Sequence, residues 1–304
     1  MSSLTVLLPA PALDVTYLVD ALMPGQIHRP RRVLRLAGGK GLNLARVATR
    51  LGCATSVIAP LGGHIGALVA DLAAAEGITL LAVPVAGETR SCVTVATDAG
   101  LTEFYEPAAE LSDREAAEFL AAGRAAAPTG WTVLAGSVGS GIPLAALVDM
   151  LASRSGAGER LAIDTHGAAL AAIVRDLRPA LVKVNRREAS ELLELDSDAL
   201  HLARLLRDRT DGIVVVTDGE NGSAAATGEG GWRVPPPPRG HYPVGSGDAF
   251  FGGLLASLAQ EQPIPVALAQ ASAAGAANAA EPGAGLLSMD LVHEFLHDIR
   301  AVAA

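Results

Sequence analysis

The sequence has 304 residues and a mass of 30.8 kDa, and its 23 Lys and Arg against 32 Asp and Glu give a formal net charge of −9. Half of the residues are hydrophobic, which suffices for a sizeable core and excludes an intrinsically disordered chain. The acidic balance argues against a nucleic-acid partner, because binding a phosphate backbone needs a basic face.

Short apolar segments alternate with longer amphipathic ones along the chain. The expected strands are Val6–Leu8, Thr55–Ala59, Val133–Ala135, Leu161–Asp164, Leu181–Val184 and Ile213–Thr217, and the expected helices are Leu42–Leu51, Ile65–Glu76, Asp113–Ala126, Pro143–Ser153 and Ser197–Arg209. Almost wholly apolar strands separated by helices indicate a parallel sheet covered on both faces. The sequence therefore predicts an α/β fold.

Two segments interrupt this alternation. Gln26–Leu36 and Thr89–Glu106 carry alternating or β-branched residues without an intervening helix, which indicates strands of a smaller, separate sheet. Such a sheet could reach out from the main domain and serve as a lid, and ordinary surface hairpins are the alternative. From Phe250 onward the chain is Ala-rich and expected to be helical.

Cellular location is indicated only by what the sequence lacks. Cys53 and Cys92 form neither a disulfide framework nor a zinc pattern, as expected for buried thiols in a reducing compartment. No basic-then-apolar leader and no uninterrupted run of about 18 apolar residues is seen, so no membrane span is expected. The expectation is a cytoplasmic protein.

The segment Val244–Gly253 carries the strongest chemical signal. Gly245 and Gly247 form a Gly-x-Gly turn that opens a helical pattern, so unpaired N–H groups and the positive helix end converge on one point. Such a point binds an anion without a basic side chain. Asp248 beside it makes sense as a general base that activates a hydroxyl toward a bound phosphoryl group. The alternative is an Asp that merely caps the helix.

Two further segments are polar at expected helix starts. Ala37–Arg46 contains three glycines that permit close approach of a ligand, together with Lys40 and Asn43. Lys183–Glu188 ends a strand and continues as Asn-x-x-Glu, which fits a capping box. Its functional alternative has Asn185 and Glu188 arranging Mg²⁺ and its waters around nucleotide phosphates.

The ordered set of these segments resembles the ribokinase-like PfkB carbohydrate kinases over the whole chain, and in particular the branch that phosphorylates ketose phosphates. The resemblance implies a doubly wound, mostly parallel sheet with helices on both faces and a small β-sheet lid. It implies one domain over residues 1–304, with lid strands within about 14–36 and 89–106. The motifs that carry it are Gly38–Asn43, Thr89-Arg90, Gly136-Ser137, Asp164, Lys183–Glu188, Thr217–Gly219 and Gly245–Asp248.

The resemblance also implies a reaction, in which the γ-phosphoryl group of ATP passes to a hydroxyl of a ketohexose phosphate, with Mg²⁺ as cofactor. Asp248 then corresponds to the general base, and Gly245, Ser246 and Gly247 to the anion hole. A homodimer through the lid sheet is expected. The implied contacts to the sugar phosphate are Asp14, Gly38, Gly39, Lys40, Asn43, Arg90 and Ser137, with Arg90 clamping the phosphate.

A second group of positions corresponds to the nucleotide and metal site. It comprises Lys183, Asn185, Glu188, Thr217, Gly219, Gly222 and Asn278, with Glu188 holding Mg²⁺ through water and Asn278 beside the adenine. Around the sugar site the sequence departs from the family pattern at Ala10, Tyr105 and His166. The identity of the sugar therefore stays open, and the alternatives are a kinase of a free sugar or nucleoside and an inactive regulator that binds a sugar or nucleotide.

Overall fold

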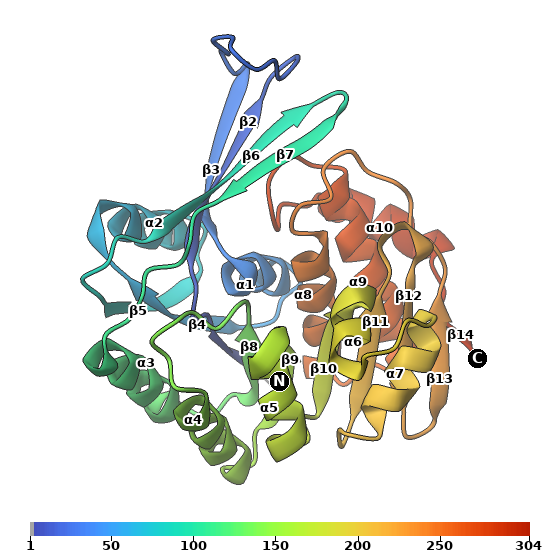
Figure 1. Ribbon diagram of the computed structural model, residues 1–304. Coiled ribbons are helices and arrows are strands. Elements are labelled where there is room, and N and C mark those ends of the chain that lie inside the picture. Colours follow the sequence, from blue (N-terminus) through green and yellow to red (C-terminus); the bar gives the residue numbers. More distant parts are fainter. Residues whose placement is uncertain (1–2) are drawn as a thin grey trace.

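A large, mostly parallel sheet forms the centre of the computed structural model, which describes residues 3–304 (Figure 1). Within those residues the sheet has ten strands in the order β14-β13-β12-β11-β10-β9-β8-β1-β4-β5. The strands from β11 to β5 are parallel, and β12, β13 and β14 add an antiparallel edge. Their bounds are β1 (Ser3–Leu7), β4 (Thr55–Leu61), β5 (Thr79–Pro84), β8 (Gly130–Ala135), β9 (Arg160–Asp164), β10 (Leu181–Asn185), β11 (Ile213–Thr217), β12 (Ser223–Thr227), β13 (Gly230–Val234) and β14 (Val302–Ala303).

Helices cover both faces of this sheet and bury two separate cores. Consecutive strand residues point to opposite faces, so Val6 lies in one core and Leu7 in the other. The helices of the first core are α1 (Lys40–Arg50), α2 (Gly63–Ala75), α8 (Ser246–Ala259), α9 (Ile264–Ala279) and α10 (Met289–Asp298). Those of the second are α3 (Asp113–Ala125), α4 (Leu144–Gly156), α5 (Gly167–Leu177), α6 (Arg186–Leu193) and α7 (Ala199–Arg207). The α/β prediction is confirmed, and each strand and helix expected from the sequence is present with bounds shifted by a few residues.

A small second sheet projects from the large one and stands over the carboxyl ends of its strands (Figure 1). It has the order β3-β2-β6-β7, with β2 (Ala12–Leu18), β3 (Arg32–Gly38), β6 (Arg90–Thr97) and β7 (Gly100–Tyr105). The pairs β2–β3 and β6–β7 are antiparallel, whereas β2 and β6 run parallel. The expected strand from Gln26 is wrong in its start, because the chain forms an exposed turn there and enters β3 only at Arg32.

No helix in the described part of the chain is long and apolar enough to cross a bilayer.

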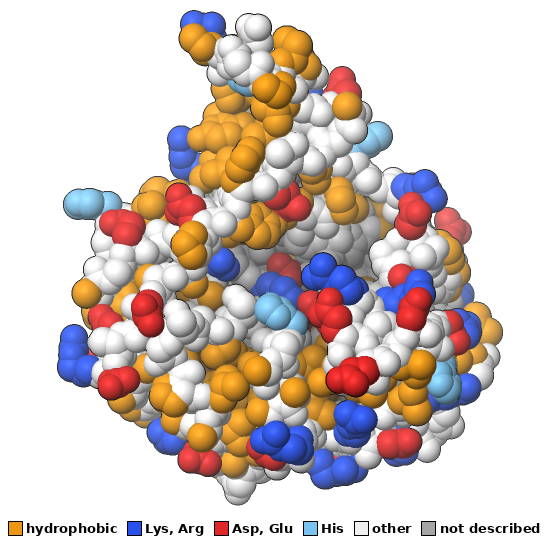
Figure 2. Space-filling view, in the orientation of Figure 1, with side chains coloured by type: hydrophobic (Ala, Val, Ile, Leu, Met, Phe, Trp, Pro, Cys, Tyr) orange, Lys and Arg blue, Asp and Glu red, His pale blue; other side chains and the backbone are white. Residues whose placement is uncertain are grey.

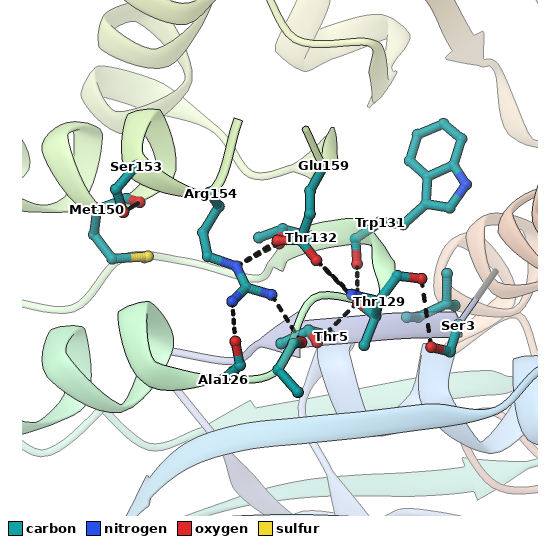
Figure 3. A network of polar contacts seen from close by, with 12 residues as sticks. Ser3, Thr5, Ala126, Thr129, Trp131, Thr132, Met150, Ser153, Arg154 and Glu159 are labelled. Atoms are coloured by element: carbon teal, nitrogen blue, oxygen red, sulfur yellow. Dashed lines mark hydrogen bonds and ion pairs between the residues drawn. The ribbon is translucent and has the colours of Figure 1, made fainter. Parts of the chain in front are cut away.

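A buried ion pair ties the opposite, amino-terminal edge of the large sheet together (Figure 3). Arg154 at the end of α4 pairs with Glu159, which precedes β9, and both side chains are almost fully buried. The Thr132 hydroxyl donates to Glu159 Oε2 at 2.8 Å, and the Thr129 N–H donates to Oε1 at 2.7 Å. The remaining Arg154 donors reach the main-chain carbonyls of Ala126 and Ala127. The network leaves neither charge unpaired.

Substitution Arg154→Met should therefore destabilise the protein strongly. It leaves the Glu159 carboxylate buried without a counter-charge, a change that costs about 3–5 kcal/mol. The matched control is Arg175→Met, because the Arg175–Asp176 pair is exposed and worth at most about 1 kcal/mol. Urea unfolding of both variants measures the difference. Equal midpoints for the two variants would contradict a structural role for the buried pair.

Candidate functional site

The candidate site lies where α8 begins, beneath the small sheet. Figure 2 shows a hollow there, with charged side chains of both signs gathered at its floor. Two cavities meet at the first turn of α8. One, the small-sheet cavity, has about 350 Å³ and includes Gly245 and Asp248 in its lining. The other, the α8–α9 cavity, has about 520 Å³ and includes Ser246 and Gly247. A group at this turn can therefore contact ligands in both.

The turn before α8 requires glycine. Gly245 is the N-cap of α8 with φ 81°, in the left-handed region that favours glycine. A Cβ at Gly245 would lie 2.7 Å from Ala284 Cα, so no side chain fits. The Ser246 N–H donates to the Pro243 carbonyl at 3.1 Å, which removes this amide from the expected anion hole. The amides of the next positions remain at a helix start, where such groups lack intrahelical acceptors.

Asp248 does not cap the helix. α8 has no side-chain capping bond, and the buried Asp248 carboxylate instead accepts a hydrogen bond from Asn43 at 3.0 Å. The same Asn43 Nδ2 donates to Asp14 Oδ2 at 3.3 Å. One amide thus joins two carboxylates from distant segments, and both carboxylates line the small-sheet cavity.

Both carboxylates are harder to ionise than usual. Burial raises the pKa of Asp248 to about 6 from its usual 3.8, opposed by Lys40 and reinforced by Asp164. Burial also raises the pKa of Asp14 to about 6, opposed by the Asn43 hydrogen bond and the Arg46 charge. Desolvation dominates in each case because it penalises the charged form. A carboxylate with a pKa near 6 is ionised at neutral pH and still able to take a proton.

Room for Asp14 is made by Gly38 on the neighbouring strand. A Cβ at Gly38 would lie 2.2 Å from Asp14 Cγ. Gly39, with φ 92°, caps α1 and sets Lys40 and Asn43 in the first turn of that helix. The two glycines therefore allow the Asp14 carboxylate, the Lys40 ammonium and the Asn43 amide to line one cavity. The predicted grouping of Asp14, Gly39, Lys40 and Asn43 is what the fold produces.

Asp164 at the end of β9 holds two ammonium groups. Lys40 Nζ lies 2.7 Å from its Oδ1 and Lys183 Nζ lies 3.0 Å from its Oδ2. Burial alone would raise the pKa of Asp164, but Lys183 and Lys40 outweigh it and hold that pKa below its usual value. Burial disfavours the charged form of Lys40, yet Asp164, Asp248 and Glu188 together raise its pKa above the usual value. Asp164 and Lys40 are therefore both charged at neutral pH.

Lys183 reaches the start of α8 from the floor of the site. A Cβ at Gly247 would lie 3.1 Å from Lys183 Nζ, so the ammonium lies against the first turn of the helix. The ammonium and the helix amides form a positive region at the junction of the two cavities. From the sequence, Asp164 is named as part of a family motif but has no assigned role, although its place at the carboxyl end of an apolar strand was a usable signal.

The α8–α9 cavity brings together another predicted group. Thr217, Gly219 and Gly222 line it. Gly222 has φ 91°, and a Cβ there would also clash with the Val234 carbonyl, so the position requires glycine. The Ser246 hydroxyl is buried and has no partner within the described chain. Small residues of α9 complete the wall at Ser272, Gly275, Ala276 and Ala279.

Some predicted residues do not line this cavity. Asn278 is fully buried, and its amide donates to the carbonyls of Val244 and Gly283 and accepts from the Gly285 N–H, so it braces the loops instead. Asn278 is not among the residues that line the cavity, and its expected place beside the adenine stays a prediction. Asn185 and Glu188 form the capping box of α6, as their spacing predicts.

Arg90 and Ser137 both line the small-sheet cavity. Arg90 Nη1 donates to the Glu106 carbonyl at 3.2 Å, and Nη2 donates to the Ala10 carbonyl at 3.4 Å. Its Nε is buried and has no hydrogen-bond partner among residues 3–304. The guanidinium is thus held at the cavity wall by main-chain carbonyls and retains an unused donor.

Comparison with known proteins agrees with this geometry. Residues 10–290 match the model of the pfkB family carbohydrate kinases. The chain belongs to this family. A carbohydrate kinase of this kind is a phosphotransferase. The family also supports the ribokinase-like description of the two sheets.

Solved structures of pfkB-type kinases share the whole fold. Escherichia coli phosphofructokinase-2 in complex with fructose-6-phosphate is 25% identical, with a TM-score of 0.88 over 98% of this chain and 99% of that one. A phosphofructokinase candidate from Staphylococcus aureus has 23% identity and a TM-score of 0.81, with 99% of each chain covered. A 1-phosphofructokinase candidate from Thermotoga maritima has 18% identity and a TM-score of 0.87, again over 99% of each. The last two likenesses concern the fold alone.

Proposed function

We propose that this carbohydrate kinase transfers the γ-phosphoryl group of ATP to a hydroxyl of a sugar phosphate, with a ketohexose phosphate as the substrate class. The observation that carries the proposal is the position of Asp248. Its buried carboxylate faces the small-sheet cavity from the turn that also lines the α8–α9 cavity. A sugar hydroxyl in one cavity and a triphosphate in the other would meet there.

Asp248 acts as the general base in this proposal. It accepts the proton of the attacking hydroxyl while the new oxygen–phosphorus bond forms and ADP leaves. Phosphoryl transfer asks for positioning and charge stabilisation more than for covalent chemistry. The helix amides and the ammonium groups of Lys40 and Lys183 supply fixed positive charge at the junction. Closure of the small sheet would exclude water, the competing nucleophile.

The α8–α9 cavity fits a nucleotide. The unpartnered Ser246 hydroxyl and the amides at the start of α8 offer donors to phosphate oxygens. The small residues of α9 leave room beside the helix for a planar base. Thr217, Gly219 and Gly222 would border the phosphates, and Lys183 would neutralise their charge.

Magnesium fits as an ion held mainly by phosphate oxygens and water. No cluster of three or more His, Cys, Asp or Glu side chains within residues 3–304 could bind a metal by itself. Mg²⁺ commonly keeps several waters and takes one or two carboxylates, so Glu188 could contribute through water while it caps α6 with Asn185. When bound, the ion supplies charge neutralisation for the transferred group.

Arg90 supports a phosphorylated sugar over a free one. Its guanidinium lines the small-sheet cavity with an unused Nε, and a planar cation suits a phosphate group. The rival function, a kinase of a free sugar or nucleoside, is favoured by the two main-chain carbonyls that already occupy Nη1 and Nη2. An inactive regulator is disfavoured by the complete Asp248 site.

Substitution Arg90→Ala should raise the KM for a sugar phosphate and lower kcat/KM by about 10–10²-fold, the scale of a lost charge-assisted contact. Turnover of ATP at saturating sugar should change much less. The control is Arg124→Ala, an exposed arginine on α3. Steady-state kinetics of both variants measures the effect. If Arg90→Ala lost no more than about 1 kcal/mol of transition-state stabilisation, as calculated from kcat/KM, Arg90 would not bind the phosphate of the substrate.

The proposed function is tested by ADP release in the presence of Mg²⁺ and a panel of acceptors. The panel contains fructose-1-phosphate, fructose-6-phosphate, tagatose-6-phosphate, ribose, fructose and adenosine. Turnover of a phosphorylated ketose is the expected result. Turnover of unphosphorylated acceptors alone would overturn the sugar-phosphate assignment and leave the reaction type intact.

We further propose a homodimer through the small sheet. Apolar side chains are exposed on β3 and on the turn before it, namely Val33, Leu22, Met23 and Ile27, and Figure 2 shows hydrophobic surface over the projecting sheet. Light scattering at micromolar concentration should give twice the mass of 30.8 kDa. The variant Ile27→Asp should shift the equilibrium toward monomer, and a monomeric wild-type protein would contradict the proposal.

A further inference from the structure

Arg46 is a buried arginine that the reaction itself does not use. It lies on α1, one turn after Asn43, and its side chain is 3% exposed. Its guanidinium pairs with Glu76 at the end of α2 and donates to the Ala37 carbonyl at 2.6 Å. It is thus held rigidly from several sides, directly behind the residue that joins the two carboxylates.

The contact between Arg46 and Asn43 decides how the Asn43 amide points. Arg46 Nη1 donates to Asn43 Oδ1 at 3.1 Å. The two ends of an asparagine amide are nearly equal in shape, so hydrogen-bond partners determine which end carries the NH₂ group. A guanidinium can only donate, so the end that faces Arg46 must be the oxygen.

The opposite end of the amide meets two acceptors. Asn43 Nδ2 donates to Asp14 Oδ2 and Asp248 Oδ2, which accept when they are ionised. A reversed amide would place its oxygen against both carboxylates and its NH₂ group against the guanidinium, so all the contacts would become repulsive. Every partner therefore favours the same orientation.

We propose that Arg46 is a positioning residue of this kinase, which locks the Asn43 amide so that its NH₂ group holds the base Asp248 and the sugar-binding Asp14 at a fixed separation. The inference rests on the proposed function for the roles of the two carboxylates. Its geometric part, the locked amide, stands without it.

The loop at Ala284 and Gly285 also contacts the Arg46 guanidinium and helps to fix its position. Arg46 Nη1 also donates to the Ala284 carbonyl at 3.1 Å, in the loop that packs on Gly245. A Cβ at Gly285 would lie 3.0 Å from Arg46 Nη1 and 2.8 Å from the Asn43 carbonyl oxygen, and Gly285 has φ 70°. One guanidinium thus connects the segment before Gly38, the Asn43 amide and the loop beside the start of α8.

Charged groups from several elements act on the two carboxylates. Their influence on any titration must be considered together, because interacting sites titrate as a set. The groups are Arg46 and Lys40 from α1, Arg90 from β6, Asp164 from β9 and Lys183 from β10, with Glu76 from α2 paired to Arg46.

The first experiment observes the Asn43 amide directly by ¹⁵N–¹H NMR of the full-length protein, with Asn43→Asp used to identify its side-chain signal. In the wild type a single NH₂ pair should exchange slowly with water. In Arg46→Met its hydrogen exchange should accelerate by about tenfold or more, because the lock is lost. An unchanged exchange rate would overturn the proposal.

Three further variants separate positioning from general stability. Arg46→Lys keeps a donor-only cation and should restore much of the protection of the amide. Glu76→Gln removes the charge of the ion-pair partner and should leave the Asn43 signal intact. The matched control is Arg50→Met, since Arg50 lies one turn further along α1 and donates to the Leu287 carbonyl. If Arg46→Met does not fold, the Arg46→Lys and Glu76→Gln results still decide. An Asn43 amide that lost its protection from exchange in Glu76→Gln would contradict the proposal.

The second experiment measures kinetics on whichever panel acceptor is turned over. Arg46→Met should lower kcat by about 10–100-fold and raise the sugar KM, as expected for a displaced catalytic group, with the ATP KM changed by less than about twofold. The acid limb of its kcat profile should move to higher pH, because Asp248 loses a donor to its ionised form. An unchanged limb and kcat would contradict positioning. A wild type inactive on the whole panel would instead refute the proposed function, and the NMR result would still stand.

Discussion

Replacement of Asp248 by asparagine should lower kcat by about 10²–10⁴-fold, the usual contribution of a general base. The substitution preserves the shape of the side chain and removes its ability to accept a proton. The α8–α9 cavity is lined by the neighbouring Ser246 and Gly247, so ATP binding should persist. Single-turnover kinetics with a nucleotide-binding assay checks both. Near-normal turnover would mean that the base lies elsewhere.

The control for this variant is Asp14→Asn. Asp14 has a similarly raised pKa and shares the Asn43 amide, but we assign it to sugar binding. Its loss should raise the sugar KM more than it lowers kcat. In the wild type the acid limb of kcat should lie near pH 6, and it should be absent from the residual activity of Asp248→Asn. Equal effects of the two variants on kcat would contradict the separate roles.

Asp248→Asn should also change how stability depends on pH. In the folded protein the pKa of Asp248 is about 6, above its usual 3.8, so the unfolded chain loses this proton at lower pH than the folded protein does. The free energy of unfolding therefore falls as the pH rises from about 4 to about 6, through this group alone. Asparagine does not ionise, so the variant does not lose this part of the free energy of unfolding and should be more stable than the wild type at pH 7–8. Thermal unfolding at pH 4, 6 and 8 measures it.

Replacement of Asp164 by asparagine should have the second large effect. It leaves the Lys40 and Lys183 ammonium groups without the carboxylate that now contacts both. Removing one partner of a buried ion pair costs about 3–5 kcal/mol of stability. The same change releases both ammonium groups from the junction, and loss of such electrostatic stabilisation lowers kcat by about 10²–10³-fold.

The matched control for this variant is Asp211→Asn. Asp211 pairs with Arg178, and both side chains are at least half exposed, so its loss should cost at most about 1 kcal/mol. A double variant, Asp164→Asn with Lys40→Met, should recover part of the stability, because one uncompensated charge is removed. Urea unfolding and steady-state kinetics measure the two effects. If Asp164→Asn behaved like Asp211→Asn, the carboxylate would have no role in holding the ammonium groups.

Much of the architecture follows from local sequence pattern. Strands such as Ile213–Thr217 are rich in β-branched residues, and helices such as Asp113–Ala125 carry their own capping signals. The small sheet was recognisable from alternation in Thr89–Glu106. By contrast, the β12–β13 hairpin escaped prediction, since three alanines in Ser223–Thr227 have little preference for a strand. Pairing with β11 on one side and β13 on the other makes that segment extended.

The candidate site divides in the same way. The Gly-x-Gly turn at Gly245 and the helix that follows are local, so the sequence by itself determined the helix start and the adjacent Asp248. The tertiary structure decided what surrounds them. Asn43 reaches Asp248 across 205 positions, and Lys40 reaches Asp164 across 124. Such contacts depend on strand order, which places β1, β8 and β9 side by side although they are far apart in the chain.

Asn278 is a polar side chain whose partners only the packed chain reveals. Its place in the sequence predicts a position beside the adenine. In the structure its side-chain amide is buried and donates to the carbonyls of Val244 and Gly283. A buried amide must satisfy its hydrogen bonds, and only the packing of two loops on α9 decides that backbone groups do so. The sequence by itself determined the fold class and the helix start that carries Asp248. The tertiary structure alone decided which polar side chains line a cavity and which brace the loops, because burial and partner are properties of the packed chain.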